Sequence, residues 1–98
     1  MQTKGTILIV EDEKNICDFM EASLRAQGYK TVVTGLAKEG IALAASLCPD
    51  VILLDLGLPD MDGVEVLRNV RSWSLLPVIV ISARVEEQQK VELLDLGA

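Results

Sequence analysis

The chain has 98 residues, half of them hydrophobic, and a formal net charge of −6. This length suits one domain, and the hydrophobic share predicts a globular rather than a disordered chain. The acidic balance argues against nonspecific nucleic-acid binding, since no basic stripe is present to release counterions from phosphates. The chain contains no histidine, which excludes catalysis or metal binding through imidazole. The N-terminus lacks the layout of a signal peptide and no apolar run approaches a membrane span, so we expect a cytoplasmic protein.

Short apolar runs alternate with stretches of helical periodicity along the whole chain. The first and third runs are unbroken and rich in β-branched residues and leucine, as strands buried on both faces of a parallel sheet are. The second run is weaker and suits a half-exposed edge. This alternation predicts an α/β fold with a parallel sheet joined by right-handed crossovers. We expect strands at residues 6–10, 29–34, 50–55 and 77–81, and helices at about 13–27, 37–47, 64–73 and from about 86 onward.

Each of the first three predicted helices has an apolar stripe at helical spacing. Such a stripe predicts the side that packs on the sheet. The stripes comprise Ile16, Phe19, Met20 and Leu24 in the first helix, Ile41, Ala44 and Ala45 in the second, and Val64, Leu67 and Val70 in the third.

Acidic residues follow two of the predicted strands. Glu11 and Asp12 come directly after the first strand, and Asp55 closes the third. Because parallel strands end at one edge of a sheet, we expect these three carboxylates to converge in one crevice. Crowded carboxylates need a compensating cation, and hard oxygen ligands of this kind suit Mg²⁺. A simpler interpretation is that these acids only cap the helices that follow them.

A hydroxyl residue, Ser82, follows the fourth strand. Acids and a hydroxyl at strand ends suit a carboxylate nucleophile beside a metal ion, with the hydroxyl contacting an oxygen of an incoming phosphoryl group. An alternative role for Ser82 is to cap the last helix. No Gly-x-Gly-x-x-Gly follows the first strand and no P-loop is present, so the sequence does not support dinucleotide binding or a phosphate-cradling loop.

Three segments, residues 7–13, 53–63 and 77–84, resemble the motifs of the receiver domain of two-component response regulators. They span nearly the whole chain at the spacing of that family. The resemblance implies a flavodoxin-like, doubly wound parallel sheet with strand order 2-1-3-4. Within the middle segment, Pro59 and Gly63 match the turn that shapes the family's active-site loop. The amino-acid sequence of this segment is most similar to that of receivers of winged-helix transcription regulators, such as those of potassium-uptake operons.

The resemblance also implies a role for each candidate site residue. Asp55 matches the phosphoacceptor, which takes a phosphoryl group from a sensor histidine kinase. Asp12 matches the acid that binds Mg²⁺ directly, Glu11 the acid that acts through water, and Gly57 the residue that offers a backbone carbonyl to the metal. Ser82 matches the residue that contacts the phosphoryl group and moves on activation. The chain would then be a signalling module and not an enzyme.

The chain departs from the family pattern at its C-terminal end. A receiver normally continues into a fifth strand, which carries a lysine that pairs with the phosphoryl group, and a fifth helix. We therefore expect residues 1–98 to form an incomplete receiver domain, without a DNA-binding output domain and without direct nucleic-acid binding. In the last helix we expect Val91 and Leu94 to be buried. Leu93 and Leu96 would then lie bare beside the edge of the fourth strand, which predicts self-association.

Two other functions are compatible with these residues. One is a phosphorylation-independent interaction module built on the receiver scaffold. This alternative is favoured because no residue of the chain matches the family's lysine that pairs with the phosphoryl group. The other is a phosphatase of the haloacid-dehalogenase type, which also uses an Asp nucleophile after a strand together with Mg²⁺. That family normally has a second Asp two positions later, where this chain has Gly57. The sequence therefore favours the phosphoacceptor module, with the interaction module as the alternative.

Overall fold

Strands and helices alternate along the chain, as predicted. The computed structural model describes residues 4–81, 91 and 94–97. Every strand and helix between residues 6 and 80 agrees with its predicted range to within two residues at either end. None of the helices in the described residues is both long and apolar enough to cross a membrane. The elements are β1 (Thr6–Val10), α1 (Lys14–Ala26), β2 (Lys30–Thr34), α2 (Ala37–Leu47), β3 (Val51–Leu54), α3 (Gly63–Arg71) and β4 (Val78–Val80).

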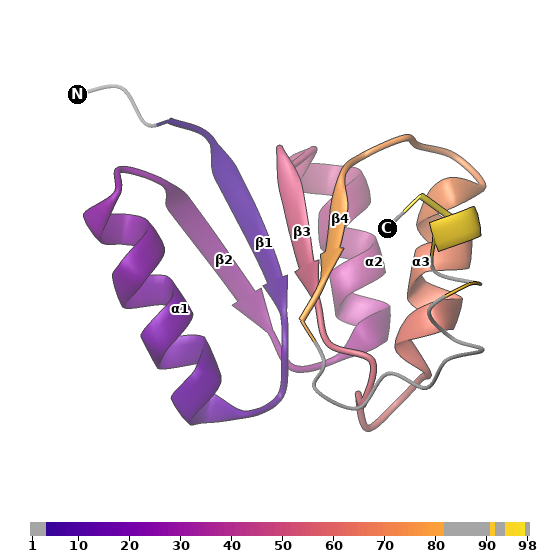
Figure 1. Cartoon of the computed structure of the whole chain (residues 1–98), viewed down its shortest axis with the longest axis horizontal. Coiled ribbons are helices and arrows are strands. Elements are labelled where there is room, and N and C mark those ends of the chain that lie inside the picture. The colour runs from indigo at the N-terminus through magenta and orange to yellow at the C-terminus, as the bar shows by residue number, and fades with distance from the viewer. Residues whose placement is uncertain (1–3, 82–90, 92–93, 98) are drawn as a thin grey trace.

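The four strands form one sheet in the order β2-β1-β3-β4, and every pair is parallel (Figure 1). This is the predicted strand order. In the register of the sheet, Leu8 of β1 lies opposite Val32 of β2 and Ile52 of β3. All four strands therefore end at the same edge of the sheet, where the candidate residues follow β1 and β3.

The central strand β1 is buried on both of its faces. Leu8, Ile9 and Val10 have no exposed surface. Successive side chains of a strand point to opposite faces, so Leu8 and Val10 face the core beneath α2 and α3, and Ile9 faces the other side. Fully burying a side chain of this size contributes about 1.5–3 kcal/mol, which is why an unbroken apolar run predicts this position in the sheet.

Helices α2 and α3 lie side by side and cover one face of the sheet (Figure 1). The stripe predicted for α3 is confirmed, because Val64, Leu67 and Val70 are all buried. In α2 the prediction is wrong for Ala45, which is exposed, while Ala44 is buried. The buried stripe runs through Ala37, Gly40 and Ala44 at spacings of three and four residues, which leaves the next position outside it.

Helix α2 also approaches the sheet unusually closely. A Cβ atom added to Gly40 would lie 2.9 Å from Cγ2 of Val10, so a larger residue would push the helix away from β1. This contact sets the height of α2 above the strand that leads into the candidate site.

Helix α1 buries fewer of its apolar side chains against the sheet than its apolar stripe predicts. Cys17 is buried, but Phe19 is 73% exposed and Ile16 is 45% exposed. The reason is the position of the helix: α1 packs along β2, at the edge of the sheet, so only a narrow stripe of it is covered (Figure 1). On β4, Ile79 is also more than half exposed.

The predicted burial of Val91 and Leu94 in the last helix is wrong. Their side chains are 61% and 70% exposed, respectively. Leu96 was expected to be bare, but it is partly buried and packs against the main core. Leu93 lies outside the described residues. The backbone carbonyl groups of Leu96 and Gly97 are bound by a side chain of α3.

One arginine holds the end of the last helix. Arg71, at the end of α3, donates from Nε to the carbonyl oxygen of Leu96 at 2.6 Å and from Nη2 to that of Gly97 at 3.2 Å. From Nη1 it also donates to the carbonyl oxygens of Leu76 and Ser74, at 2.7 and 3.4 Å. A single guanidinium thus joins α3, the segment before β4 and residues 96–97.

Candidate functional site

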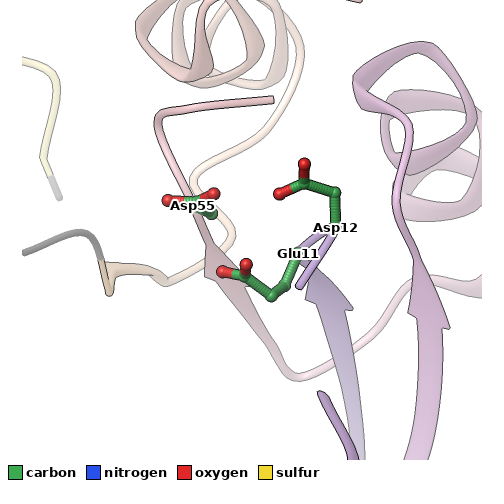
Figure 2. A group of neighbouring side chains, drawn as sticks. All are labelled: Glu11, Asp12 and Asp55. Carbon is green, nitrogen blue, oxygen red and sulfur yellow. The ribbon is translucent and has the colours of Figure 1, made fainter. Parts of the chain in front are cut away.

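Three carboxylates meet at the C-terminal edge of the sheet (Figure 2). Glu11 and Asp12 follow β1, and Asp55 follows β3. Each side chain has an oxygen within 4.8 Å of an oxygen of the other two. The structure therefore brings together the three acids that the sequence predicted to converge.

Backbone pairing between β1 and β3 fixes this convergence. Val10 lies opposite Leu54 at the last paired position of the two strands. The pairing then continues for one more step, because the backbone N–H of Asp55 donates to the carbonyl oxygen of Val10 at 2.9 Å. On the other side, the N–H of Glu11 donates to the carbonyl oxygen of Thr34 at 2.9 Å. Glu11 and Asp55 therefore follow neighbouring strands at adjacent positions in the register of the sheet.

The carboxylate of Glu11 is buried, with only 5% of the residue exposed. Its Oε1 accepts a hydrogen bond from the backbone N–H of Glu13 at 3.0 Å. Burial raises the pKa of Glu11, and the carboxylates of Asp55 and Asp12 raise it further, although the bond from Glu13 acts in the opposite direction. A negative charge at this position is therefore costly unless a cation offsets it.

Capping does not account for these acids. Helix α1 has its own N-cap in Glu13, whose side chain accepts from the backbone N–H of Asn15. Helix α3 has its own N-cap in Asp62, which accepts from the N–H of Val64 at 3.0 Å. The helices that follow β1 and β3 are thus capped by other residues, which removes the basis of the simpler interpretation.

A cysteine under the site ties α1 to the end of β1. The thiol of Cys17 is buried and donates to the carbonyl oxygen of Glu11 at 3.2 Å. Burial raises the pKa of this thiol, and the nearby carboxylate of Glu11 adds to the effect. Cys17 therefore acts here as a neutral hydrogen-bond donor that holds the backbone of the acidic segment.

The loop from β3 to α3 is anchored on both sides of Gly57. Leu56 and Leu58 are buried, whereas Gly57 between them is exposed. A Cβ atom added to Gly57 would lie 3.8 Å from Oδ2 of Asp55, which places this residue beside the carboxylate. At the end of the loop, a Cβ atom on Gly63 would lie 2.6 Å from Cα of Leu56, so only glycine fits there.

Asp60 has a structural role that the sequence did not reveal. Its carboxylate accepts from the backbone N–H of Ala37 at 2.7 Å and from that of Lys38 at 3.0 Å. These two bonds, that from Lys38 first, lower the pKa of Asp60. Helix α2 needs such a partner because its own N-cap residue, Leu36, makes no side-chain cap bond. A leucine at the start of a predicted helix was the available signal.

The remaining candidate, Ser82, lies outside the described residues, so its place near Asp55 stays a prediction. The acids themselves suit a hard divalent cation, since all of their donor atoms are carboxylate oxygens. Asp12 is exposed and Asp55 is half-buried, which leaves both accessible from solvent, and Glu11 lies deeper. This arrangement fits direct metal binding by Asp12 and Asp55 and a less direct part for Glu11.

A family model described as the response regulator receiver domain matches residues 7–98. The chain belongs to this family. The receiver is 48% identical over 92 residues to the KDP operon transcriptional regulatory protein KdpE of Escherichia coli. It is 41% identical over 92 residues to the response regulator ArlR of Staphylococcus saprophyticus. Each match covers 94% of the receiver but only 41% or 42% of the relative, so the chain spans less than half the length of these proteins.

Solved structures agree with the family and the fold. A CheY-like receiver domain protein of Methanospirillum hungatei superposes with a TM-score of 0.90 at 30% identity, over 99% of this chain and 78% of that one. The BeF3-activated N-terminal receiver domain of Klebsiella pneumoniae RstA superposes with a TM-score of 0.88 at 26% identity, over 95% of this chain and 80% of that one. The predicted resemblance to receivers of transcription regulators is thus confirmed.

The raised pKa of Glu11 predicts how this site affects stability. A carboxyl group whose folded pKa lies above its ordinary 4.5 binds its proton more tightly when folded. Stability therefore falls as the pH rises through the window between the two values. We expect Glu11→Gln to increase the free energy of unfolding near neutral pH in metal-free buffer, and to have little effect below the ordinary pKa.

Urea titrations of both proteins at about pH 7 and about pH 4 measure this difference. The exposed Glu39 of α2 supplies a control, because Glu39→Gln also removes one carboxylate charge, from a residue that does not belong to the acidic cluster. A Glu11→Gln variant that is no more stable than the parent near neutral pH would contradict the prediction.

Proposed function

We propose that this receiver accepts a phosphoryl group on Asp55 from a sensor histidine kinase, with Mg²⁺ bound at the acidic site. The observation that carries the proposal is the convergence of Glu11, Asp12 and Asp55 within 4.8 Å. Membership of the response regulator family supports it. We further propose that the module works in the cytoplasm and controls a DNA-binding output domain of a longer protein. The relatives named as transcriptional regulatory proteins support this proposal.

The carboxylates of Asp12 and Asp55 and the backbone carbonyl of Gly57 would hold the metal, with Glu11 acting through water. When bound, Mg²⁺ offsets negative charge on these ligands and on the phosphoryl oxygens. The half-buried carboxylate of Asp55 is the nucleophile, because it stands at the end of a rigid strand and is open to solvent. Its position is fixed by the backbone bond from Asp55 to Val10.

In the transfer step, a carboxylate oxygen of Asp55 forms a bond to phosphorus. The bond between phosphorus and the imidazole nitrogen of the donor histidine breaks, and its electron pair returns to that nitrogen. The hydroxyl of Ser82 is proposed to contact one phosphoryl oxygen. The acyl phosphate adds charge beside two carboxylates, which favours a rearrangement of the surrounding loops that a partner then recognises.

We predict that Asp12→Ala weakens Mg²⁺ binding by about tenfold or more, because it removes a charged ligand. Asp12→Asn keeps an oxygen without its charge and should fall between the two. Amide NMR shifts during a Mg²⁺ titration measure the affinities. Asp18→Ala, an exposed position on α1, removes the same charge outside the acidic cluster and should leave the affinity nearly unchanged. Equal affinity in the parent and in Asp12→Ala would refute the site.

Phosphorylation has its own test. After exposure to acetyl phosphate and Mg²⁺, the parent protein should gain the mass of one phosphoryl group, whereas Asp55→Asn should gain none. Asp18→Asn is the matched control and should react like the parent. Phosphate mapped to a residue other than Asp55 would overturn the assignment. No phosphate from any donor would favour the alternative, an interaction module that works without phosphorylation.

We also propose that the receiver self-associates through the last helix and the edge of β4. Within the described residues, β4 has a neighbouring strand only on its β3 side. Its unpaired backbone groups can pair with another chain. Val91 and Leu94 add exposed apolar surface, in place of the expected Leu96.

Light scattering across a concentration series tests this association. We expect the mass to rise with concentration, and the combined change Val91→Lys and Leu94→Lys to reduce that rise. Leu75 is 90% exposed in the segment before β4, so Leu75→Lys is a control for the loss of one apolar surface residue. A monomer at every concentration would refute self-association.

A further inference from the structure

We propose that Asp60 is a positioning residue that fixes the metal-binding loop relative to Asp12 by fastening that loop to the start of α2. The inference rests on the proposed Mg²⁺ site. Its first support is the pair of bonds that the Asp60 carboxylate accepts from the backbone N–H groups of Ala37 and Lys38, at 2.7 and 3.0 Å. Two bonds to one rigid helix end fix both the position and the orientation of a carboxylate.

The second support is that the same helix start touches the first acidic segment. A Cβ atom added to Gly35 would lie 3.4 Å from Cα of Asp12 and 3.6 Å from its Cβ. Next to it, the carbonyl oxygen of Thr34 accepts from the N–H of Glu11 at 2.9 Å, and the hydroxyl of Thr34 accepts from the N–H of Leu36 at 3.2 Å. Residues 34–38 therefore contact Asp12 on one side and hold Asp60 on the other.

The third support is the way the loop itself is anchored. Leu56 and Leu58 are buried and hold its first half, and Asp62 caps α3 at its end. Between these anchors, Asp60 is exposed, so its attachment comes from hydrogen bonds rather than from burial. The position of Gly57 relative to Asp12 thus depends on two anchors: the burial of its neighbours and the bonds of Asp60 across to α2.

A looser loop should bind metal less well. If Asp60 is removed, the backbone carbonyl of Gly57 samples more positions relative to Asp12, and ordering it on binding costs free energy. Residues that only support metal ligands commonly change metal affinity by about 10–100-fold when they are lost. If Asp60 did no more than cap α2, its loss would lower stability and leave Mg²⁺ affinity alone.

The matched comparison is Asp60→Ala with Asp62→Ala. Each change removes one carboxylate from the same loop and one N-terminal cap from a helix. Of the two carboxylates, that of Asp60 bonds to α2, whereas that of Asp62 bonds to α3. Three measurements apply to each variant: urea unfolding, Mg²⁺ affinity by NMR titration, and amide shifts without metal. We expect both variants to be less stable, and Asp60→Ala to weaken Mg²⁺ binding about tenfold more than Asp62→Ala does.

In the metal-free spectra, Asp60→Ala should move the amide signals of Ala37, Lys38 and Asp12, whereas Asp62→Ala should leave that of Asp12 in place. Asp60→Asn retains one acceptor oxygen and should give an intermediate affinity, which guards against a general folding defect in the alanine variant. Equal loss of Mg²⁺ affinity in the two alanine variants overturns the inference and leaves the proposed function standing. If the parent binds no Mg²⁺, the proposed function fails, and an unmoved Asp12 signal in Asp60→Ala overturns the inference as well.

Discussion

The site depends on the register of the parallel pair β1 and β3. With Val10 opposite Leu54, the next residues along each strand are Glu11 and Asp55, and the bond from the N–H of Asp55 to Val10 holds them level. A shift of one residue would turn every side chain of a strand to the other face. In β1 it would exchange the side chains packed beneath α2 and α3 with those of the other face, and it would also separate the acids. The hydrophobic pattern that stabilises the sheet and the geometry of the acidic cluster are thus set by the same pairing.

Sequence patterns predicted the element boundaries and the convergence of the acids, because these follow from apolar runs and from the shared edge of parallel strands. The strand order was predicted from the resemblance to receiver domains and not from these patterns. They failed where burial depends on the neighbours of a helix. Phe19 lies on an apolar stripe, yet α1 packs at the edge of the sheet and leaves it exposed. Asp60 was missed because its partners, Ala37 and Lys38, are more than twenty positions away. Leu36 indicates that α2 needs a cap from elsewhere, but it does not indicate which residue supplies that cap.

The negative charge of the acidic cluster lowers the stability of the fold and at the same time favours the binding of a cation. Burial raises the pKa of Glu11, so its charge weakens the fold near neutral pH. The same charge increases the attraction for a divalent cation. Hydrogen bonds donated by backbone N–H groups hold the cluster in place despite the repulsion between its members. That of Glu13 donates to the Glu11 carboxylate, and those of Glu11 and Asp55 donate to the carbonyl oxygens of Thr34 and Val10, respectively. The three carboxylates are therefore prearranged, which would lower the ordering cost for a cation bound between them, as the proposed function requires.

Arg71 has a further consequence for how motion passes through the molecule. Its guanidinium donates to Ser74 and Leu76 before β4 and to Leu96 and Gly97 beyond it. Lysine, with a single nitrogen on a flexible chain, has no such planar fork with which to reach both sets of carbonyls in this arrangement. The segment before β4 and residues 96–97 are therefore held by the same side chain. A displacement at the end of the last helix would therefore reach the start of β4 through Arg71, although Leu76 and Leu96 are twenty positions apart in the sequence.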